Sequence, residues 1–260
     1  PNFKKGWSVH NLGQTRSCKR HNFFLLTPDT FVRTVLPGMR ACCAIVHVGA
    51  AAEAKFAQYS AEFESGGELG GTDSQRFIYV LEGSLRLEVD GRKSELGANA
   101  YAYIPEGSPH RVIAARSSRS AVIEKPYQPL SAVSAPKLLI STEGQISSHA
   151  LGDDPGLQVK FLLPDEMAFD FAVNTMVYQP GAALSMVEMH VMEHGLLMLE
   201  GGGIYRLDDS WHSVTAGDFI WMAPWCPQWF GAIGKTPAKY LIYKDWNRHP
   251  LAGGPHESRG

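Results

Sequence analysis

The sequence predicts an all-β protein made of two tandem β-barrels. Short apolar runs rich in β-branched and aromatic residues alternate with glycine and proline along most of the chain, which is typical of strands and turns. One combination of strand and turn recurs in the second half, which indicates an internal duplication. At 260 residues, with 44% hydrophobic and 19% charged residues, the chain is long enough to bury a core in each half.

The strand predictions rest on apolar runs bounded by turn residues. Clear examples are FIYVLEGSLRLEV (77–89), ANAYAYIP (98–105), GIYRLDD (203–209) and GDFIWMAP (217–224). Asp90-Gly91 follows the first run and is typical of a two-residue hairpin turn. Amphipathic helical patterns are scarce, and residues 164–171 are expected to form only a short turn or helix.

The repeat centres on a Leu-Glu-Gly turn. IYVLEG (78–83) and LLMLEG (196–201) each end an apolar strand, and each is followed by a paired strand and then by Gly and Pro at similar spacing. The period is about 118–119 residues. We therefore expect an N-terminal barrel over residues 1–135 and a C-terminal barrel over residues 136–260, with the Pro-rich and polar stretch 125–150 between the copies.

The C-terminal half contains a set of residue types that bind metals. Glu188 and His190 are separated by one residue, so both side chains share a face if they lie on a strand. His194 follows after a short turn, and Gln228 lies about 34 residues later, after a second turn. One carboxylate, two imidazoles and one amide oxygen suit Mn²⁺, Fe²⁺ or a similar divalent ion. Without an ion, this arrangement would bury an uncompensated carboxylate at considerable cost.

The N-terminal copy lacks this set. Aligning the two turns places other residue types at the positions of the carboxylate and the imidazoles: Gly70, Thr72 and Arg76. His110 alone is retained, near the position of Gln228. Because one histidine cannot usefully hold a labile divalent ion, we expect the first barrel to be a degenerate copy without a metal site, kept for packing and assembly.

These features resemble the cupin superfamily, and the two copies resemble the bicupins. The ExHxxxHG spacing over residues 188–195, Gln228 in place of the usual histidine of the second motif, and YLIYKD (240–245) are similar to the (S)-ureidoglycine aminohydrolase family. The stretch HNFFLLTPDTFVRTVLPG (21–38) is also similar to the start of that family. The resemblance covers nearly the whole chain.

The resemblance implies two tandem cupin barrels and an enzyme that hydrolyses (S)-ureidoglycine to (S)-ureidoglycolate and ammonia in purine (allantoin) catabolism. It implies Mn²⁺ as the cofactor, with another divalent transition metal possible. The ion would orient the substrate and polarise the substituents of the reacting carbon. Its expected ligands are Glu188, His190, His194 and Gln228.

The expected catalytic residues are Glu188 and Lys244. Lys244 and Tyr240 are four residues apart on a predicted strand, so their side chains share a face. Lys244 is expected to bind the substrate carboxylate, and Tyr240 and Tyr205 are expected to contact the substrate as hydroxyl donors. Glu188 is expected to bind both metal and substrate and to accept a proton as ammonia leaves. Glu193, next to a ligand, is expected to face outward.

Two other functions remain open. An iron-dependent cupin dioxygenase uses similar carboxylate and imidazole ligands, although the neutral amide of Gln228 is a weaker ligand than the histidine such enzymes generally use. A non-catalytic ligand-binding bicupin is the second alternative, although a complete metal set together with Lys244 exceeds what a scaffold needs. Oxygen consumption would distinguish the dioxygenase from the hydrolase.

Charge and composition restrict the partners. A net charge of -2 and a pI near 6.6 argue against binding to nucleic acid. No apolar run of about 18 residues predicts a membrane span, and no signal-like run begins the sequence, so a cytoplasmic protein is expected. The four cysteines form no CxxC pair and are expected to be free thiols. We expect a small-molecule substrate and, because β-sheets with open edges tend to pair, a homo-oligomer.

Overall fold

The computed structural model describes residues 15–248, and the all-β prediction is confirmed within that range. The helices there are single 3-10 turns: η1 (Pro28–Thr30), η2 (Ala50–Ala52) and η3 (Glu143–Gln145). Residues 164–171 contain a turn and lead into the strand that begins at Phe171. None of the described helices combines the length and the apolar character that crossing a membrane requires.

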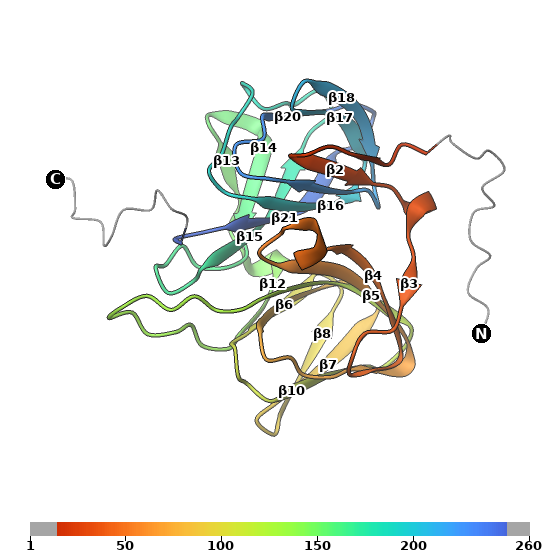
Figure 1. The fold of residues 1–260 in the computed structure, drawn as a ribbon, viewed down its shortest axis with the longest axis vertical. Coiled ribbons are helices and arrows are strands. Elements are labelled where there is room, and N and C mark those ends of the chain that lie inside the picture. The colour runs from red at the N-terminus through yellow and green to blue at the C-terminus, as the bar shows by residue number, and fades with distance from the viewer. Residues whose placement is uncertain (1–14, 249–260) are drawn as a thin grey trace.

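The first barrel is built from a ten-stranded sheet and lies below the second in Figure 1. All of its strand pairs are antiparallel, with β5 at the centre between β4, β10 and β11. Its strands are β3 (Arg33–Thr34), β4 (Met39–Val48), β5 (Ala57–Leu69), β6 (Gln75–Glu82), β7 (Ser84–Val89), β8 (Arg92–Gly97), β9 (Ala100–Ile104), β10 (His110–Ala114), β11 (Ser118–Lys125) and β12 (Leu139–Thr142).

The second barrel combines an eight-stranded sheet with a three-stranded sheet. The larger sheet contains β1 (Cys18–Lys19), β2 (Phe23–Leu26), β13 (His149–Leu151), β14 (Asp154–Phe161), β15 (Phe171–Tyr178), β16 (His194–Glu200), β19 (Phe219–Met222) and β21 (Ala238–Asp245). The smaller sheet contains β17 (Gly202–Leu207), β18 (Ser210–Thr215) and β20 (Gln228–Ala232).

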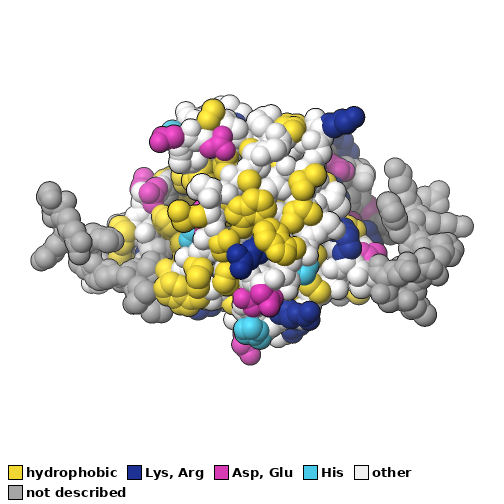
Figure 2. Space-filling model, turned by 90° about the horizontal axis from the view of Figure 1, so that it is seen from above, with side chains coloured by type: hydrophobic (Ala, Val, Ile, Leu, Met, Phe, Trp, Pro, Cys, Tyr) yellow, Lys and Arg dark blue, Asp and Glu magenta, His cyan; other side chains and the backbone are white. Residues whose placement is uncertain are grey.

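Hydrophobic side chains gather near the middle of the surface seen from above in Figure 2, which is the side of the second barrel. The second barrel has several large, exposed hydrophobic residues, among them Trp211, Trp225 and Ile233. Grouped hydrophobic side chains of this kind are typical of protein contacts. The expected self-association stays a prediction.

The duplication predicted from the Leu-Glu-Gly turns is present strand by strand. The first copy runs β6, β7, β8, β9, β10 and β11, and the second runs β16, β17, β18, β19, β20 and β21 in the same order. Both turns use a glycine with positive φ, 86° at Gly83 and 61° at Gly201, a conformation that other residues adopt only with strain. The predicted hairpin at Asp90-Gly91 connects β7 to β8, with Val89 paired to Arg92.

Three strands cross the boundary predicted between residues 135 and 136, because β1 and β2 belong to the larger sheet of the second barrel and β12 to the sheet of the first. β2, from the start of the chain, pairs with β19 of the second barrel, with Trp221 opposite Phe24. β12, from the second half, pairs with β9 of the first barrel, with Ile140 opposite Ala102. The boundary therefore describes the sequence repeat, whereas each sheet includes a strand from the other half of the chain.

Three buried clusters form the core, one inside each barrel and one between the barrels. Strand β21 shows how the sheet divides them. Tyr240 and Ile242 belong to the cluster inside the second barrel, whereas Leu241 and Tyr243 belong to the cluster between the barrels. Because side chains alternate along a strand, Lys244 lies on the same face of β21 as Tyr240, as predicted.

Charged residues are also buried between the barrels. Lys125, on β11, is 1% exposed, and its Nζ contacts Asp170 Oδ2 at 3.1 Å and Asp245 Oδ1 at 3.3 Å. Gln75 Nε2 donates a hydrogen bond of 2.6 Å to the other oxygen of Asp170. These bonds connect β6 and β11 of the first barrel to Asp170, which directly precedes β15, and to β21 of the second, and so help to fix the relative position of the two sheets.

His47 makes the contact between the barrels sensitive to acid. Its ring stacks on Phe219 at 4.8 Å between centroids, its Nε2 lies 2.9 Å from Ser60 Oγ, and burial lowers its pKa from 6.5 to about 3. Between these values the unfolded chain binds the proton and the folded protein does not, so the free energy of unfolding decreases as pH falls below 6.5. We expect His47 to account for a loss of about 2.5 kcal/mol between pH 7.5 and 4.5.

Urea unfolding of the wild type and of His47→Gln at several pH values measures this effect. Gln is neutral throughout, so the variant should lose less stability on acidification than the wild type, whatever its stability at pH 7.5. Parallel pH profiles for the two proteins would show that the pKa of His47 is nearly the same in the folded protein as in the unfolded chain, and would contradict the prediction.

Candidate metal centre and active site

The first two predicted ligands lie in an irregular segment at the mouth of the second barrel. Residues 181–193 do not form a regular strand, so the expectation that Glu188 and His190 alternate along one is wrong. The segment is held instead by isolated bridges, of which Glu188 with Gln228 is one. In that bridge Glu188 N donates to Gln228 O at 2.8 Å, and Gln228 N donates to Glu188 O at 2.9 Å. The backbone thus connects two predicted ligands that are distant in sequence.

Glu188 and His190 contact each other directly. His190 Nε2 lies 3.0 Å from Glu188 Oε2, and both side chains are about one third exposed, at 31% and 32%. His190 O accepts a hydrogen bond of 2.6 Å from Trp225 N, which ties this residue to the turn before Gln228. The pair is therefore accessible from solvent and anchored through its backbone.

His194 opens strand β16, as predicted, and its side chain is buried at 2% exposure. Its ring centroid lies 5.2 Å from that of His190, and Lys244 is its Cα partner on the adjacent strand β21. Burial, the Lys244 cation and His190 together hold the pKa of His194 well below its usual value, so the imidazole is neutral and can act as a ligand. Burial also lowers the pKa of Lys244, and the negative charge of Glu188 opposes that shift.

The predicted tyrosines line the interior beside these groups. Tyr205 O–H donates to Gln228 Oε1 at 3.1 Å, and Tyr240 O–H lies 2.8 Å from the hydroxyl oxygen of Tyr178. Burial raises the pKa values of all three phenols, and the nearby Glu188 contributes to each shift, so they remain protonated donors. Tyr178 was not predicted from the sequence, although its place at the end of β15, just before the segment with the ligands, could have indicated it.

Glu193 is buried and faces the first barrel, so its predicted outward orientation is wrong. It is 3% exposed, accepts a hydrogen bond of 3.0 Å from Lys55 N, and lies within 3.3 Å of Trp221 Nε1. Burial raises its pKa. Glu193 therefore anchors the chain immediately before His194 to a residue of the other barrel.

The donor types at this site fit a divalent transition metal, and one observation supports the fit directly. Nδ1 of His194 is buried and has no hydrogen-bond partner among the described residues. As the side chains lie here, however, no three His, Cys, Asp or Glu groups within residues 15–248 form a set that would hold an ion. To bind an ion, Glu188 and His190 would have to give up their contact with each other, and Gln228 would have to give up its hydrogen bond from Tyr205. The metal therefore stays a prediction.

Comparison with known proteins defines the class of protein. A family model described as a cupin domain matches residues 63–124 and 174–243, one segment in each barrel. Oxalate decarboxylase from Bacillus subtilis shares the fold with a TM-score of 0.62 at 13% identity, covering 86% of this chain and 76% of that one. The protein is therefore a bicupin, as the repeat and its motifs predicted.

The sequence relatives define the family more closely. An (S)-ureidoglycine aminohydrolase of Arabidopsis thaliana is 38% identical over 92% of this chain and 80% of its own length. The enzyme of the same name from Escherichia coli is 32% identical over 94% and 95%. The crystal structure of protein Ylba from E. coli superposes with a TM-score of 0.81 at 29% identity, covering 90% and 96%. The chain belongs to the (S)-ureidoglycine aminohydrolase family.

Proposed function

We propose that this protein hydrolyses (S)-ureidoglycine to (S)-ureidoglycolate and ammonia, a step of purine catabolism, with a divalent metal ion such as Mn²⁺ at the mouth of the second barrel. The relatives' shared name supports the reaction. The observation that carries the proposal in the structure is the grouping of Lys244 with the predicted ligands, because His194 is its partner on the neighbouring strand.

Each side chain has a role that its surroundings support. Lys244 provides a cation for the substrate carboxylate, and its position on β21 directs it to the inner face of the barrel. The protonated phenols of Tyr205 and Tyr240 donate hydrogen bonds to substrate oxygens. When bound, the metal ion would be held by Glu188, His190, His194 and Gln228 and would orient the substrate and polarise its reacting carbon.

Glu188 is the acid–base group of the proposed reaction. A water oxygen bonds to the carbon that carries the amine, the bond from this carbon to the amine nitrogen breaks, and one water proton reaches the departing nitrogen. Glu188 Oε2, at the accessible mouth of the site, accepts that proton and returns it to the leaving ammonia. In the structure the same oxygen already accepts a hydrogen bond from His190 Nε2.

Enzyme-dependent release of ammonia from freshly generated (S)-ureidoglycine tests the proposal. The wild type loaded with Mn²⁺ is expected to release ammonia faster than spontaneous decay and to yield one enantiomer of ureidoglycolate. Lys244→Met should lower kcat/KM by about a hundredfold or more, because the substrate carboxylate loses its charged partner. Lys239→Met on the same strand, where Lys239 pairs with Glu143 instead, is the matched control.

Two results would contradict the proposal. Ammonia release equal to the uncatalysed rate with metal bound would exclude this substrate, and a racemic product would exclude the stereospecific reaction. Oxygen uptake with a small organic acid would then favour the dioxygenase alternative. Equal activity of Lys244→Met and Lys239→Met would show that Lys244 does not bind the substrate carboxylate.

A further inference from the structure

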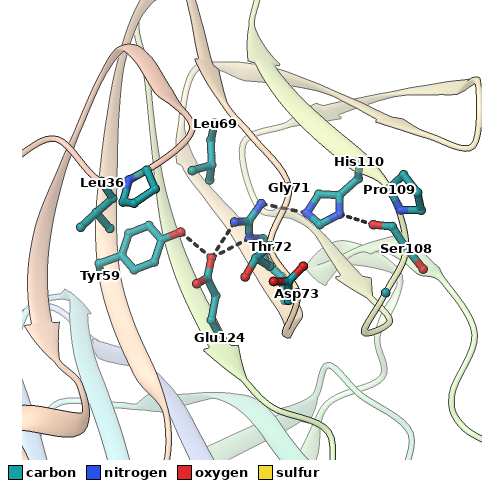
Figure 3. A pocket seen from close by; sticks show the side chains of 13 residues that line it. Leu36, Tyr59, Leu69, Gly71, Thr72, Asp73, Ser108, Pro109, His110 and Glu124 are labelled. Carbon is teal, nitrogen blue, oxygen red and sulfur yellow. Dashed lines mark hydrogen bonds and ion pairs between the residues drawn. The ribbon is translucent and has the colours of Figure 1, made fainter.

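The mouth of the first barrel contains a cavity that the proposed reaction does not use. Its volume is about 710 Å³, within the range of small-molecule sites. Figure 3 shows that polar side chains from several strands converge on it beside apolar residues of the rim. The polar residues that matter here are Tyr59, Asp73, Arg76, His110 and Glu124.

Arg76 places a permanent cation in this cavity. It lies about 118 residues before His194, at the equivalent position of the repeat, and His110 corresponds in the same way to Gln228. Arg76 is 2% exposed, and its Nη1 contacts His110 Nε2 at 2.8 Å. A guanidinium and an imidazole thus occupy the positions that two predicted metal ligands hold in the other barrel.

The bonds of His110 fix its role in this contact. Its Nδ1 lies 2.7 Å from the carbonyl oxygen of Ser108, which can only accept, so Nδ1 carries the proton. Nε2 therefore accepts a hydrogen bond from Arg76. Burial lowers the pKa of His110, and the positive charge of Arg76 adds to that shift, so the ring stays neutral.

Arg76 retains one donor after its protein partners are counted. A guanidinium has five N–H groups. Nη1 donates to Gly70 O at 2.7 Å and to His110, while Nε and Nη2 each donate to Glu124 Oε1, at 2.8 Å and 2.7 Å. One N–H of Nη2 is left without a partner among residues 15–248.

Glu124 retains an acceptor beside that donor. Its Oε1 also accepts a hydrogen bond of 2.7 Å from Tyr59 O–H, so all of its bonds in the described structure are made by one oxygen. Oε2 has no hydrogen-bond partner among residues 15–248, and the side chain is 19% exposed. The two partners of this ion pair therefore retain one free donor, on Arg76, and one free acceptor, on Glu124.

The charge of the cavity selects against anions. Arg76 is neutralised by Glu124, His110 is neutral, and exposed Asp73 adds a further negative charge, so the formal sum is −1. A small carboxylate or phosphate would meet two carboxylates and only one free guanidinium N–H.

We propose that this cavity binds a small neutral or cationic molecule that carries a primary amide or ureido group. The carbonyl oxygen of that group accepts from Arg76 Nη2, and its NH₂ donates to Glu124 Oε2, because such a group presents an acceptor and a donor side by side. A cationic end of the molecule lies near Asp73. This site is distinct from the one in the second barrel and does not depend on the reaction proposed there.

Titration of the full-length protein with glycinamide, followed by the side-chain ¹⁵N resonances of arginine, tests the proposal. Glycinamide has the primary amide and a cation, whereas N,N-dimethylglycinamide keeps the carbonyl and the cation but lacks the amide N–H. We expect glycinamide to shift the Arg76 Nε signal and to bind at least about tenfold more tightly than the dimethyl compound. Asp73→Asn, an exposed and conservative change, should weaken glycinamide binding several-fold.

Glu124→Gln provides a stronger test, since it replaces the free acceptor without changing the shape of the side chain, and it should abolish the difference between the two probes. Glu188→Gln in the second barrel is the control and should leave glycinamide binding unchanged. Equal binding of both probes, an Arg76 signal that does not move at saturating glycinamide, or loss of binding in Glu188→Gln would overturn the proposal. The two probes and the Arg76 signal keep it testable if Glu124→Gln does not fold.

Discussion

Replacing Glu188 with Gln is expected to reduce the release of ammonia from (S)-ureidoglycine by about a thousandfold or more. Glu188 is the one anionic donor in the predicted metal set, and removal of its charge weakens the attraction for a divalent ion. The change also removes the proposed proton acceptor. The fold should persist, because Glu188 pairs with Gln228 through backbone atoms that the substitution does not alter.

Metal content and rate distinguish these two effects. We expect Glu188→Gln to contain less Mn²⁺ after dialysis than the wild type, and excess Mn²⁺ should restore occupancy but not the rate. Glu200→Gln is the control, since Glu200 is exposed near the end of the same strand as His194. Full activity of Glu188→Gln at saturating metal would rule out the proton-transfer role, and unchanged metal affinity would rule out the ligand role.

Replacing Lys125 with Met is expected to destabilise the protein by about 3–5 kcal/mol, because the change leaves two buried carboxylates without their shared cation. Asp170 is fully buried and Asp245 is 3% exposed, so water cannot replace the lost ammonium. For a chain of this size, such a loss lowers the melting temperature by about 10 °C or more. Thermal unfolding followed by circular dichroism measures the effect.

Lys93→Met is the matched control for Lys125→Met. Lys93 also pairs with a carboxylate, Glu88, but its side chain is 64% exposed, so we expect a change of less than about 1 kcal/mol. Adding Asp170→Asn to Lys125→Met should recover part of the lost stability, because Asp170 loses its cation partner, whereas Asp245 Oδ2 keeps Lys55 Nζ at 3.7 Å. Similar melting temperatures for the Lys93 and Lys125 variants would mean that water reaches the space between the barrels.

The strands and the repeat could be predicted because their signals are local. Each strand is indicated by its own alternating apolar residues and by the glycine of the adjacent Leu-Glu-Gly turn, so the signal lies within a few residues of the strand. The structure contains both copies in the predicted order. The placement of His194 at the start of a strand and of Lys244 on the face of Tyr240 follows from the same periodicity.

The remaining features depend on contacts between distant segments. Glu193 is buried because Lys55 and Trp221 pack against it, and nothing in the residues around Glu193 indicates those partners. The irregular path of residues 181–193 follows from pairing with β20. The cavity around Arg76 could not be predicted either, since the different residue types at the ligand positions of the first copy do not say what the barrel contains instead.

The exchange of β2 and β12 limits how this chain can be divided. A fragment that ends at residue 135 would lack β12, the neighbour of β9, and a fragment that begins at residue 136 would lack β2, the neighbour of β19. Each fragment would also expose its share of the apolar cluster between the barrels. We therefore expect the half that carries the predicted metal ligands to need the other half in order to fold. A truncation that removes the first half would then leave the second half, which carries the predicted metal ligands, unable to fold.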